Sequence, residues 1–389
     1  MEIILISLSL TIWLFLLLFW GSFWRANRRI EQSSATLIST NYPTVCAVIP
    51  ARDEAEVIST SLSSLLNQDY TGEFFVVLAD DNSSDRTAEI ALATAKKLNK
   101  SQRLIVISGQ PLPPGWKGKL WAMQQGIAEA RLQTTPDYFL LTDADIEHPK
   151  NNLRRLVAKA QTQKLDLVSL MVLLRCQSFW EKLLIPAFVF FFQKLYPFAW
   201  VNSQDKSLAA AAGGCLLISN EALIEIGGIA TIKDALIDDC SLAKAVKSRG
   251  KNIWLGLSET TISLRGYDKL SVIWDTIART AYTQLNYSPL LLVGTVIGMA
   301  ITYMATPIGL ILGIFTLNWL LIALSIITWL LMTWAYLPTI KLYKLSIVWA
   351  FWLPAIALLY TFMTIDSAIK YYRGQGGNWK GRTYSRSRS

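Results

Sequence analysis

The sequence predicts an α/β domain with a mostly parallel sheet, attached to a membrane by apolar helices on both sides of it. Between residues 30 and 285, short strand-like runs alternate with helix-like stretches, which is typical of strands joined by crossover helices. Two apolar blocks, Ile3–Trp24 and Thr280–Ile340, contain no Asp, Glu, Lys or Arg. With 52% hydrophobic and 17% charged residues, the 389-residue chain is more apolar than an ordinary soluble domain.

Composition excludes several functional classes. The net charge is +9, but no Lys/Arg cluster lies inside a folded-looking segment, so we expect no nucleic-acid partner. The four cysteines form no CxxC pair, which argues against a disulfide framework or a zinc site and favours reduced thiols. The single histidine, His148, excludes multi-histidine metal cages, and we expect it in a turn or at the surface.

The first apolar block is expected to be a retained membrane anchor. Its 22 uncharged residues exceed the apolar region of a signal peptide, and no small-residue cleavage site follows. Arg25, Arg28 and Arg29 come directly after it, so the positive-inside rule places the next region in the cytoplasm and the N-terminus outside. Residues 1–29 are therefore predicted as the N-terminal transmembrane anchor and 30–285 as a cytosolic domain.

The second apolar block is too long for a single crossing. Pro307, Asn318 and Pro338 suggest breaks within it, and Lys341 and Lys344 follow it. The predicted spans lie near 290–314, 317–337 and 345–365. They form a transmembrane region over 286–368, followed by a basic polar tail over 369–389.

The charge of this tail conflicts with the number of predicted spans. One N-terminal and three C-terminal crossings, starting outside, leave the tail outside. The tail nevertheless carries Lys370, Arg373, Lys380, Arg382, Arg386 and Arg388. Either one segment is re-entrant, with Pro354 marking the last span as the candidate, or the tail breaks the charge rule.

Within the central region, strands and helices alternate in a fixed order. The predicted strands are Val45–Ile49, Phe74–Leu78, Leu104–Ile107 and Tyr138–Leu141. The predicted helices are Glu54–Leu66, Arg86–Leu98 and Leu120–Ala130. Ligands of such sheets bind beyond the carboxyl ends of the strands, so the polar residues there are the candidates for function.

Two successive strands run into acidic loops. The first continues into Pro50–Glu54 and the second into Asp80–Asp85. Asn, Ser and Asp also start helices, so the second loop taken alone is better explained as an N-cap turn. Two such loops at one sheet edge, however, can accept hydrogen bonds from a base or a ribose.

Further candidates follow along the chain. Lys119, in a basic turn before a helix, suits a pyrophosphate, although such a turn can also be a solvated one. Asp143 and Asp145 follow a buried strand and offer hard oxygen ligands to Mg²⁺ or Mn²⁺. Asp238 and Asp239 start a predicted helix, where acidic residues either complement the helix dipole or provide a general base.

Taken together, these motifs resemble the inverting, GT-A fold glycosyltransferases of family 2. The resemblance is carried by the order and spacing of Pro50–Glu54, Asp80–Asp85, Lys119, Asp143–Asp145 and Asp238–Asp239. Four longer stretches resemble the hopene-associated (hopanoid-cluster) membrane glycosyltransferases: Gly118–Gly126, Leu184–Phe192, Ala209–Gly214 and Arg279–Pro289. This resemblance covers the chain from about 45 to 310.

The resemblance implies a membrane enzyme that moves a sugar from a nucleotide-diphosphate donor, with a UDP-sugar favoured, to a lipid hydroxyl. It implies a metal site at Asp143 and Asp145, a general base at Asp239, and a sugar site shaped by Gly214 and Asp238. The residues implied to hold the nucleotide are Pro50, Glu54, Asp80, Asp81, Lys119 and Asp143.

Two segments need separate interpretation. The wider family carries a (Q/R)xxRW motif, but here Arg279 is followed by Tyr282 and Thr283 where Arg and Trp would stand. This departure disfavours a polysaccharide synthase and leaves Arg279 as the candidate to steady the diphosphate. Phe179–Val201 mixes an aromatic run with charges and is expected as a helix in the membrane interface, with ordinary core as the alternative.

Three alternative functions are kept. A polyprenyl-phosphate sugar transferase has an already charged acceptor and needs little base catalysis. A processive polysaccharide synthase is disfavoured by the broken motif. A non-catalytic scaffold or transporter subunit belongs to another class, and the uncharged stretch over 280–340 offers no ionisable residue for a transport path.

Overall fold

A computed structural model describes residues 1–32, 42–374, 378–379 and 382–383. The chain divides into two compact units, which we name the α/β unit and the helical unit. The α/β unit comprises Asn27–Arg175, Trp200–Arg265 and Trp379–Ser389, and the helical unit comprises Met1–Ala26, Cys176–Ala199 and Gly266–Asn378. Of the basic tail, Lys380, Arg386 and Arg388 lie outside the described residues.

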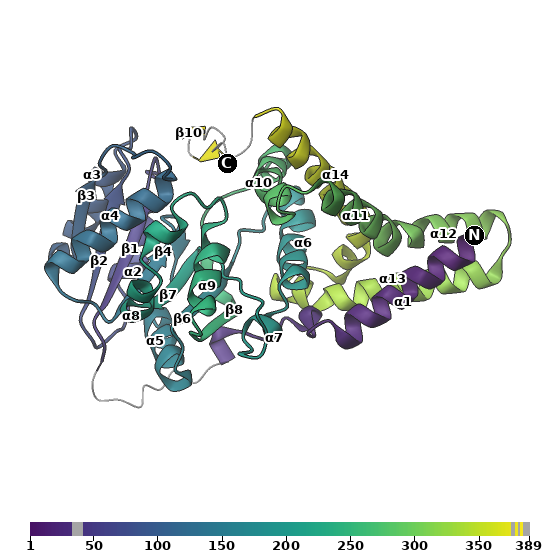
Figure 1. The fold of residues 1–389 in the computed structure, drawn as a ribbon, viewed down its shortest axis with the longest axis horizontal. Coiled ribbons are helices and arrows are strands. Elements are labelled where there is room, and N and C mark those ends of the chain that lie inside the picture. The colour runs from purple at the N-terminus through teal and green to yellow at the C-terminus, as the bar shows by residue number, and fades with distance from the viewer. Residues whose placement is uncertain (33–41, 375–377, 380–381, 384–389) are drawn as a thin grey trace. The chain divides into compact units, whose positions relative to one another are not determined.

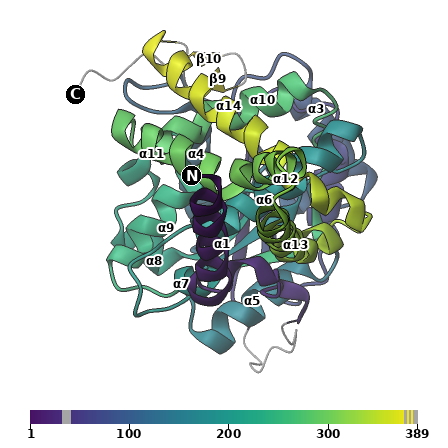
Figure 2. The same cartoon turned by 90° about the vertical axis from the view of Figure 1, so that its right-hand side faces the viewer.

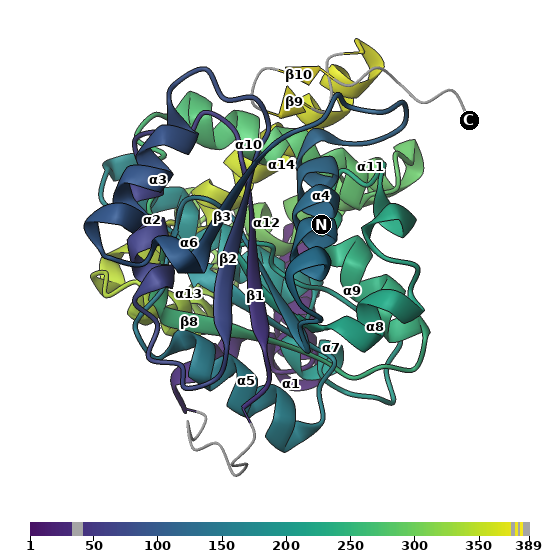
Figure 3. The same cartoon turned by 90° about the vertical axis from the view of Figure 1, so that its left-hand side faces the viewer.

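The α/β unit is built on one eight-stranded sheet, in the order β3-β2-β1-β4-β7-β6-β8-β5 (Figure 1). Figure 3 shows β1, β2 and β3 of this sheet from the left-hand side of Figure 1. Its strands are β1 (Val45–Ala51), β2 (Phe74–Asp80), β3 (Leu104–Ser108), β4 (Tyr138–Thr142), β5 (Ile146–Glu147), β6 (Leu167–Leu173), β7 (Cys215–Ser219) and β8 (Ile253–Ser263). β1 to β4 form parallel ladders, as do β6 and β8, whereas β7 runs antiparallel to both of its neighbours. The predicted GT-A-like architecture with a mostly parallel sheet is confirmed.

The helices of this unit follow the predicted order with shifted ends. They are α2 (Ile58–Leu66), α3 (Thr87–Lys97), α4 (Gly118–Gln133), α5 (Asn152–Gln163), α8 (Asn220–Glu225) and α9 (Asp238–Ser248). Short 3-10 turns lie at η2 (Ile30–Gln32), η3 (Ser101–Arg103) and η4 (Ile229–Ile232). α2 starts four residues later than expected from Glu54, because residues 55–57 form a turn in which the amides of Val57 and Ile58 both donate to the carbonyl oxygen of Glu54.

Close packing places α4 on the sheet. A Cβ at Gly126 would lie 2.5 Å from Cγ1 of Val48 on β1, so only glycine fits at this crossing. Buried side chains from β1, β2, β4 and β6 form the core of the unit. The start of α4, which carries Lys119, is therefore fixed relative to the strand ends.

The helical unit gathers segments from three parts of the sequence (Figure 2). It contains α1 (Glu2–Phe19), η1 (Phe23–Arg25), α6 (Phe179–Leu195), α10 (Leu270–Gln284), α11 (Pro289–Met299), η5 (Ala300–Met304), α12 (Ala305–Phe315), α13 (Trp319–Leu342), η6 (Ile347–Trp352) and α14 (Leu353–Tyr372). By length and composition, four helical stretches of the described chain qualify as membrane spans: Glu2–Phe19, Pro289–Phe315, Trp319–Leu342 and Ile347–Tyr372.

The segment expected as one interfacial helix over 179–201 is two helices. α6 begins with a capping box between Ser178 and Glu181 and ends at Leu195. Pro197 follows, and α7 (Phe198–Val201) begins after it. Proline disfavours helical backbone in the residue before it, which explains the break. The two-stranded pair β9 (Asn378–Trp379) and β10 (Arg382–Thr383) completes the described chain.

Candidate active site

The loops after β1 and β2 are tied together at the carboxyl edge of the sheet. Ala51 pairs with Asp80 in register, and the Arg52 guanidinium donates to the carbonyl oxygen of Asp81 at 2.7 Å. The amide of Glu54 donates to Oγ1 of Thr87 at 2.9 Å. The buried Asp80 carboxylate accepts hydrogen bonds from the amide and hydroxyl of Ser83. The structure therefore brings the acidic loops of the first two strands together.

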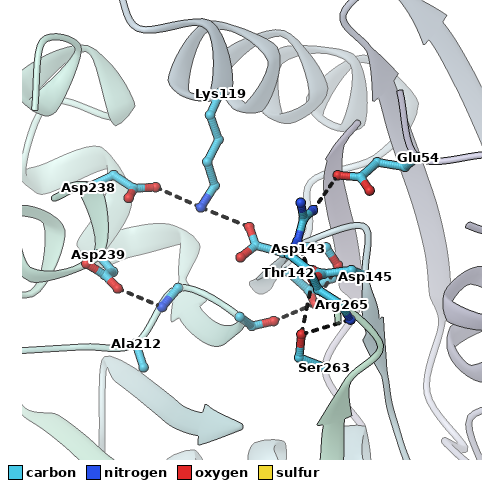
Figure 4. Close-up of polar contacts among 12 residues, drawn as sticks. Glu54, Lys119, Thr142, Asp143, Asp145, Ala212, Asp238, Asp239, Ser263 and Arg265 are labelled. Atoms are coloured by element: carbon cyan, nitrogen blue, oxygen red, sulfur yellow. Dashed lines mark hydrogen bonds and ion pairs between the residues drawn. The ribbon is translucent and has the colours of Figure 1, made fainter. Parts of the chain in front are cut away.

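Asp145 follows β4 and is almost buried, with 8% of its side chain exposed. Its Oδ2 accepts hydrogen bonds from Oγ of Ser263 at 3.1 Å and from Nε of Arg265 at 3.0 Å. Nη2 of the same arginine lies 2.8 Å from Oε1 of Glu54 (Figure 4). One guanidinium thus joins the loop after β1 to the loop after β4.

Lys119, on the first turn of α4, stands between two carboxylates. Its Nζ lies 2.9 Å from Oδ1 of Asp143 and 3.0 Å from Oδ2 of Asp238 (Figure 4). Asp143 comes from the end of β4 and Asp238 from the start of α9. The lysine therefore connects the predicted metal-binding residues with the predicted base region through two ion pairs.

Asp239, next to Asp238 on α9, has different partners. Its Oδ2 accepts a hydrogen bond from the amide of Gly213 at 2.8 Å, and its Oδ1 accepts one from the amide of Cys240 at 2.7 Å. A Cβ at Gly213 would lie 3.5 Å from both Oδ2 of Asp239 and Nζ of Lys119. The carboxylate of Asp239 thus lies close to the lysine without forming an ion pair with it in the described structure.

Burial and like charges shift the protonation of this cluster. Burial and the neighbouring Asp238 carboxylate raise the pKa of Asp239 to about 7. Burial also raises the pKa of Asp143, against the opposing effect of Lys119. For Lys119, burial lowers the pKa, but Asp143 and Asp238 outweigh it and hold the pKa above its usual range. The lysine therefore stays charged, whereas Asp239 can change its protonation near neutral pH.

The remaining predicted sugar-site residue, Gly214, lies in a tight position. A Cβ there would lie 3.2 Å from Val172 and 3.3 Å from Ile146, closer than an ordinary contact. Its carbonyl oxygen accepts a hydrogen bond from Oγ1 of Thr142 at 2.7 Å, and the same hydroxyl lies 3.1 Å from Nε2 of His148. His148 is buried rather than at the surface, and burial lowers its pKa to about 3. It is a neutral structural residue.

The two remaining predicted residues, Pro50 and Arg279, lie on elements other than those that carry Lys119, Asp143 and Asp238. Pro50 is part of β1 and pairs with Ala79 of β2. Arg279 lies on an exposed face of α10, which belongs to the helical unit.

Sequence reasoning missed Arg265 and Ser263, which contact Asp145 directly. The available signal was a strand-like run, Ile253–Leu264, followed at once by Arg265 and Gly266. β8 ends at Ser263, so this arginine also follows the end of a strand.

The site residues fit a divalent cation that binds together with a diphosphate. Within the described residues, no group of three or more His, Cys, Asp or Glu side chains is arranged to hold a metal. Asp143 and Asp145 nevertheless supply two hard carboxylates at one strand end. Mg²⁺ is characteristically held by one or two carboxylates, with waters and substrate phosphates completing its coordination.

Comparison with known proteins gives both partial relatives and a full-length structural match. The chain is 34% identical over 117 residues to a beta-monoglucosyldiacylglycerol synthase of Synechocystis, a match covering 30% of this chain and 22% of that protein. It is 33% identical over 104 residues to the probable glycosyltransferase YdaM of Bacillus subtilis, covering 26% of this chain and 23% of that protein.

Among solved structures, a mannosyltransferase from Pyrobaculum calidifontis in complex with GDP-Man and Mn²⁺ has a similar fold. The TM-score is 0.55 at 16% identity, over 96% of this chain and 99% of the other. The sequence model of glycosyl transferase family 21 matches residues 9–387. This match confirms the expected glycosyltransferase class, and the chain belongs to glycosyl transferase family 21.

Proposed function

We propose that this protein transfers a sugar from a nucleotide-diphosphate donor to the hydroxyl of a membrane lipid, with inversion at the anomeric carbon. The observation that carries the proposal is the position of Lys119 between Asp143 and Asp238, with Asp239 beside it. This arrangement joins a diphosphate-binding side to a base side in a member of a glycosyltransferase family. The relative named as a lipid glucosyltransferase supports a lipid acceptor, and the resemblance to family 2 enzymes supports inversion.

On the donor side, Asp143 and Asp145 would hold Mg²⁺ or Mn²⁺, which would neutralise charge on the leaving diphosphate. Lys119 is a fixed positive charge next to this position. Glu54, with Asp80 or Asp81, lies at the edge where the ribose and base of a nucleotide bind in α/β sheets. Arg279 is kept as a candidate to steady the diphosphate.

On the acceptor side, Asp239 is the general base. The acceptor oxygen forms a bond to the anomeric carbon, the bond from that carbon to the diphosphate breaks, and the acceptor proton passes to Asp239. A carboxylate with a pKa of about 7 suits this role near neutral pH. Asp238, held by Lys119, and Gly214 shape the sugar site.

The membrane arrangement that we propose has three crossings and one re-entrant segment. α12 and α13 are antiparallel neighbours, because a Cβ at Gly313 would lie 2.9 Å from Ile322 and one at Gly309 would lie 2.7 Å from Ser325. The start of α11 and the end of α13 are therefore on the same side. The segment after α13 returns to this side, because Tyr371 near the end of α14 stacks on Tyr287, just before α11, with ring centroids 4.5 Å apart.

The segment formed by η6 and α14 contacts α13 at a depth that agrees with its entering and leaving the membrane on the same side. Trp329 donates a hydrogen bond to the carbonyl oxygen of Phe351 on η6 at 3.0 Å. Trp329 lies ten residues from the start of α13 and thirteen from its end, so η6 contacts the middle of that helix. With the N-terminus outside, α1, α11–α12 and α13 cross the inner membrane, and the catalytic region and the basic tail are both cytoplasmic. This arrangement removes the conflict with the positive-inside rule.

A product assay tests the function. Membranes containing the protein are incubated with radiolabelled UDP- and GDP-sugars, and the lipids are extracted and fractionated. We expect label in a glycolipid whose acceptor is a neutral lipid alcohol, such as a hopanoid or diacylglycerol. Treatment of the labelled lipid with alkali or acid identifies the acceptor. Label in a polyprenyl phosphate or in a polymer would favour the alternative acceptors. Absence of any transfer, with every donor and acceptor tried, would favour a non-catalytic scaffold.

A further inference from the structure

Arg265 occupies a central position among the carboxylates of the α/β unit. Its side chain is 39% exposed, whereas its partners Glu54 and Asp145 are only 11% and 8% exposed. The backbone before it is also fixed, because the amide of Leu264 donates to the carbonyl oxygen of Asp145 at 2.8 Å. The guanidinium therefore reaches two nearly buried carboxylates, and the backbone just before it is hydrogen-bonded to the backbone of Asp145.

We propose that Arg265 is an internal counter-ion that competes with the divalent cation for Asp145. Because the same guanidinium also pairs with Glu54, binding of the cation at Asp145 changes the contact between Arg265 and Glu54. This inference rests on the proposed function, in which Asp145 is a metal ligand. Nε of Arg265 and Ser263 Oγ both contact Oδ2 of Asp145, so a cation that binds this oxygen has to displace the guanidinium.

The competition between Arg265 and the cation persists at every physiological pH, because of the chemistry of the guanidinium. Arginine stays protonated at every physiological pH, so the ion pair with Asp145 is not lost by deprotonation. Glu54 holds the other end of the same guanidinium through Nη2. Because coupling between two ligands is reciprocal, Arg265 weakens cation binding as much as the cation weakens the contact of Arg265 with Asp145.

A nucleoside diphosphate changes the competition between Arg265 and the cation for Asp145. Its phosphates supply negative charge for the displaced guanidinium, so cation and nucleotide favour each other's binding. Without nucleotide, Arg265 therefore lowers the affinity for the cation, and with nucleotide it raises that affinity. A residue with a purely structural role does not produce this change of sign.

The test measures Mn²⁺ binding directly, from the EPR signal of free Mn²⁺, on the full-length protein in detergent. Arg265→Gln removes the charge and keeps a side chain that can form hydrogen bonds. Without nucleotide, we expect it to bind Mn²⁺ about tenfold more tightly than the native protein, the scale of coupling between residues in contact. With saturating UDP or GDP, we expect weaker Mn²⁺ binding than in the native protein.

Two further variants separate this inference from the proposed function. Arg86→Ala also removes one positive charge, but its side chain is 77% exposed and pairs with Glu89, so Mn²⁺ binding is expected to stay unchanged. Asp145→Asn is expected to lose most Mn²⁺ binding. If Asp145→Asn binds Mn²⁺ normally, the metal assignment fails. If Asp145→Asn loses binding but Arg265→Gln matches the native protein with and without nucleotide, the metal assignment stands and the counter-ion role of Arg265 is wrong.

Discussion

Oδ2 of Asp239 accepts a hydrogen bond from the amide of Gly213 at 2.8 Å, whereas the adjacent Asp238 forms an ion pair with Lys119 at 3.0 Å. Two neighbouring carboxylates on one helix start thus have partners of different charge. The one without a cationic partner in the described structure has the raised pKa, about 7. This difference supports assigning proton transfer to Asp239 and sugar positioning to Asp238.

Asp239→Asn is expected to lower turnover by about two to four orders of magnitude, the scale of a positioned general base. The amide keeps the size of the side chain and one acceptor oxygen for Gly213, but it cannot take a proton. Binding of the nucleotide sugar, measured by calorimetry, is expected to remain nearly native. Asp238→Asn is the matched control and should change KM at least as much as kcat. Native turnover in Asp239→Asn with loss in Asp238→Asn would exchange the two roles.

The pH dependence of kcat/KM is expected to show a rising limb with an apparent pKa near 7, because Asp239 has to be ionised to accept a proton. Asp238→Asn removes a like charge and should move this limb to lower pH. Lys119→Met removes an opposing positive charge and should move it to higher pH. The profiles are measured under subsaturating donor. Identical limbs in all three proteins would exclude Asp239 as the titrating group.

Stability should respond to pH in the opposite direction from activity. The folded pKa of Asp239 is raised above the ordinary value of 3.8, so the folded protein binds more protons than the unfolded chain between pH 4 and 7. This carboxylate therefore contributes less to the free energy of unfolding as pH rises through that window. Asp239→Asn should flatten the decline, measured as the thermal midpoint of the protein in detergent. A decline equally steep in both proteins would contradict the raised pKa.

Gly126→Ala is expected to destabilise the protein by about 1–3 kcal/mol, the usual effect of overpacking. The new methyl would lie 2.5 Å from Cγ1 of Val48 and push α4 from the sheet. Adding Val48→Ala should restore part of the loss. Gly294→Ala on α11 is the control, because no heavy atom lies within 4 Å of the added Cβ. Thermal unfolding of the purified proteins compares these three variants with the native protein, and equal effects at Gly126 and Gly294 would contradict the packing argument.

The sequence contained enough information for the parts of the fold that depend on local pattern. The apolar runs that became β1, β2 and β4 are bounded by polar residues, and Asp143 and Asp145 lie directly after one of them. Because these strands are parallel, their ends meet at one edge, and the acidic loops could be expected there.

The parts that sequence reasoning did not find depend on contacts between distant residues. Arg265 pairs with Glu54 across 211 residues, and no local pattern records that pairing. The antiparallel β7 lies between β4 and β6 although β5 and β6 follow β4 in the chain. The proposed return of α14 does not follow from hydropathy, which gives the length of an apolar segment but not its direction.

The proposed re-entrant segment predicts that both of its ends face the cytoplasm. Gly374→Cys, just after α14, should react with a membrane-impermeant maleimide in inside-out vesicles and not in right-side-out vesicles. Leu317→Cys, in the turn between α12 and α13, should show the opposite pattern. Both variants are made in a background in which the four native cysteines are replaced by serine or alanine, so that each protein carries one thiol.

The contacts of α14 within the helical unit give the expectation its physical basis. Lys370 forms an ion pair with Asp275 of α10 at 2.7 Å, and Asp366 accepts a hydrogen bond from the indole of Trp274 at 2.8 Å. α10 ends just before α11 begins, so these charged groups lie toward the side from which α11 enters the membrane. If Gly374→Cys and Leu317→Cys react from the same side, Ile347–Tyr372 is a fourth crossing and the basic tail breaks the charge rule. If Gly374→Cys is labelled from the cytoplasmic side alone, the chain crosses the membrane three times and the basic tail obeys the positive-inside rule.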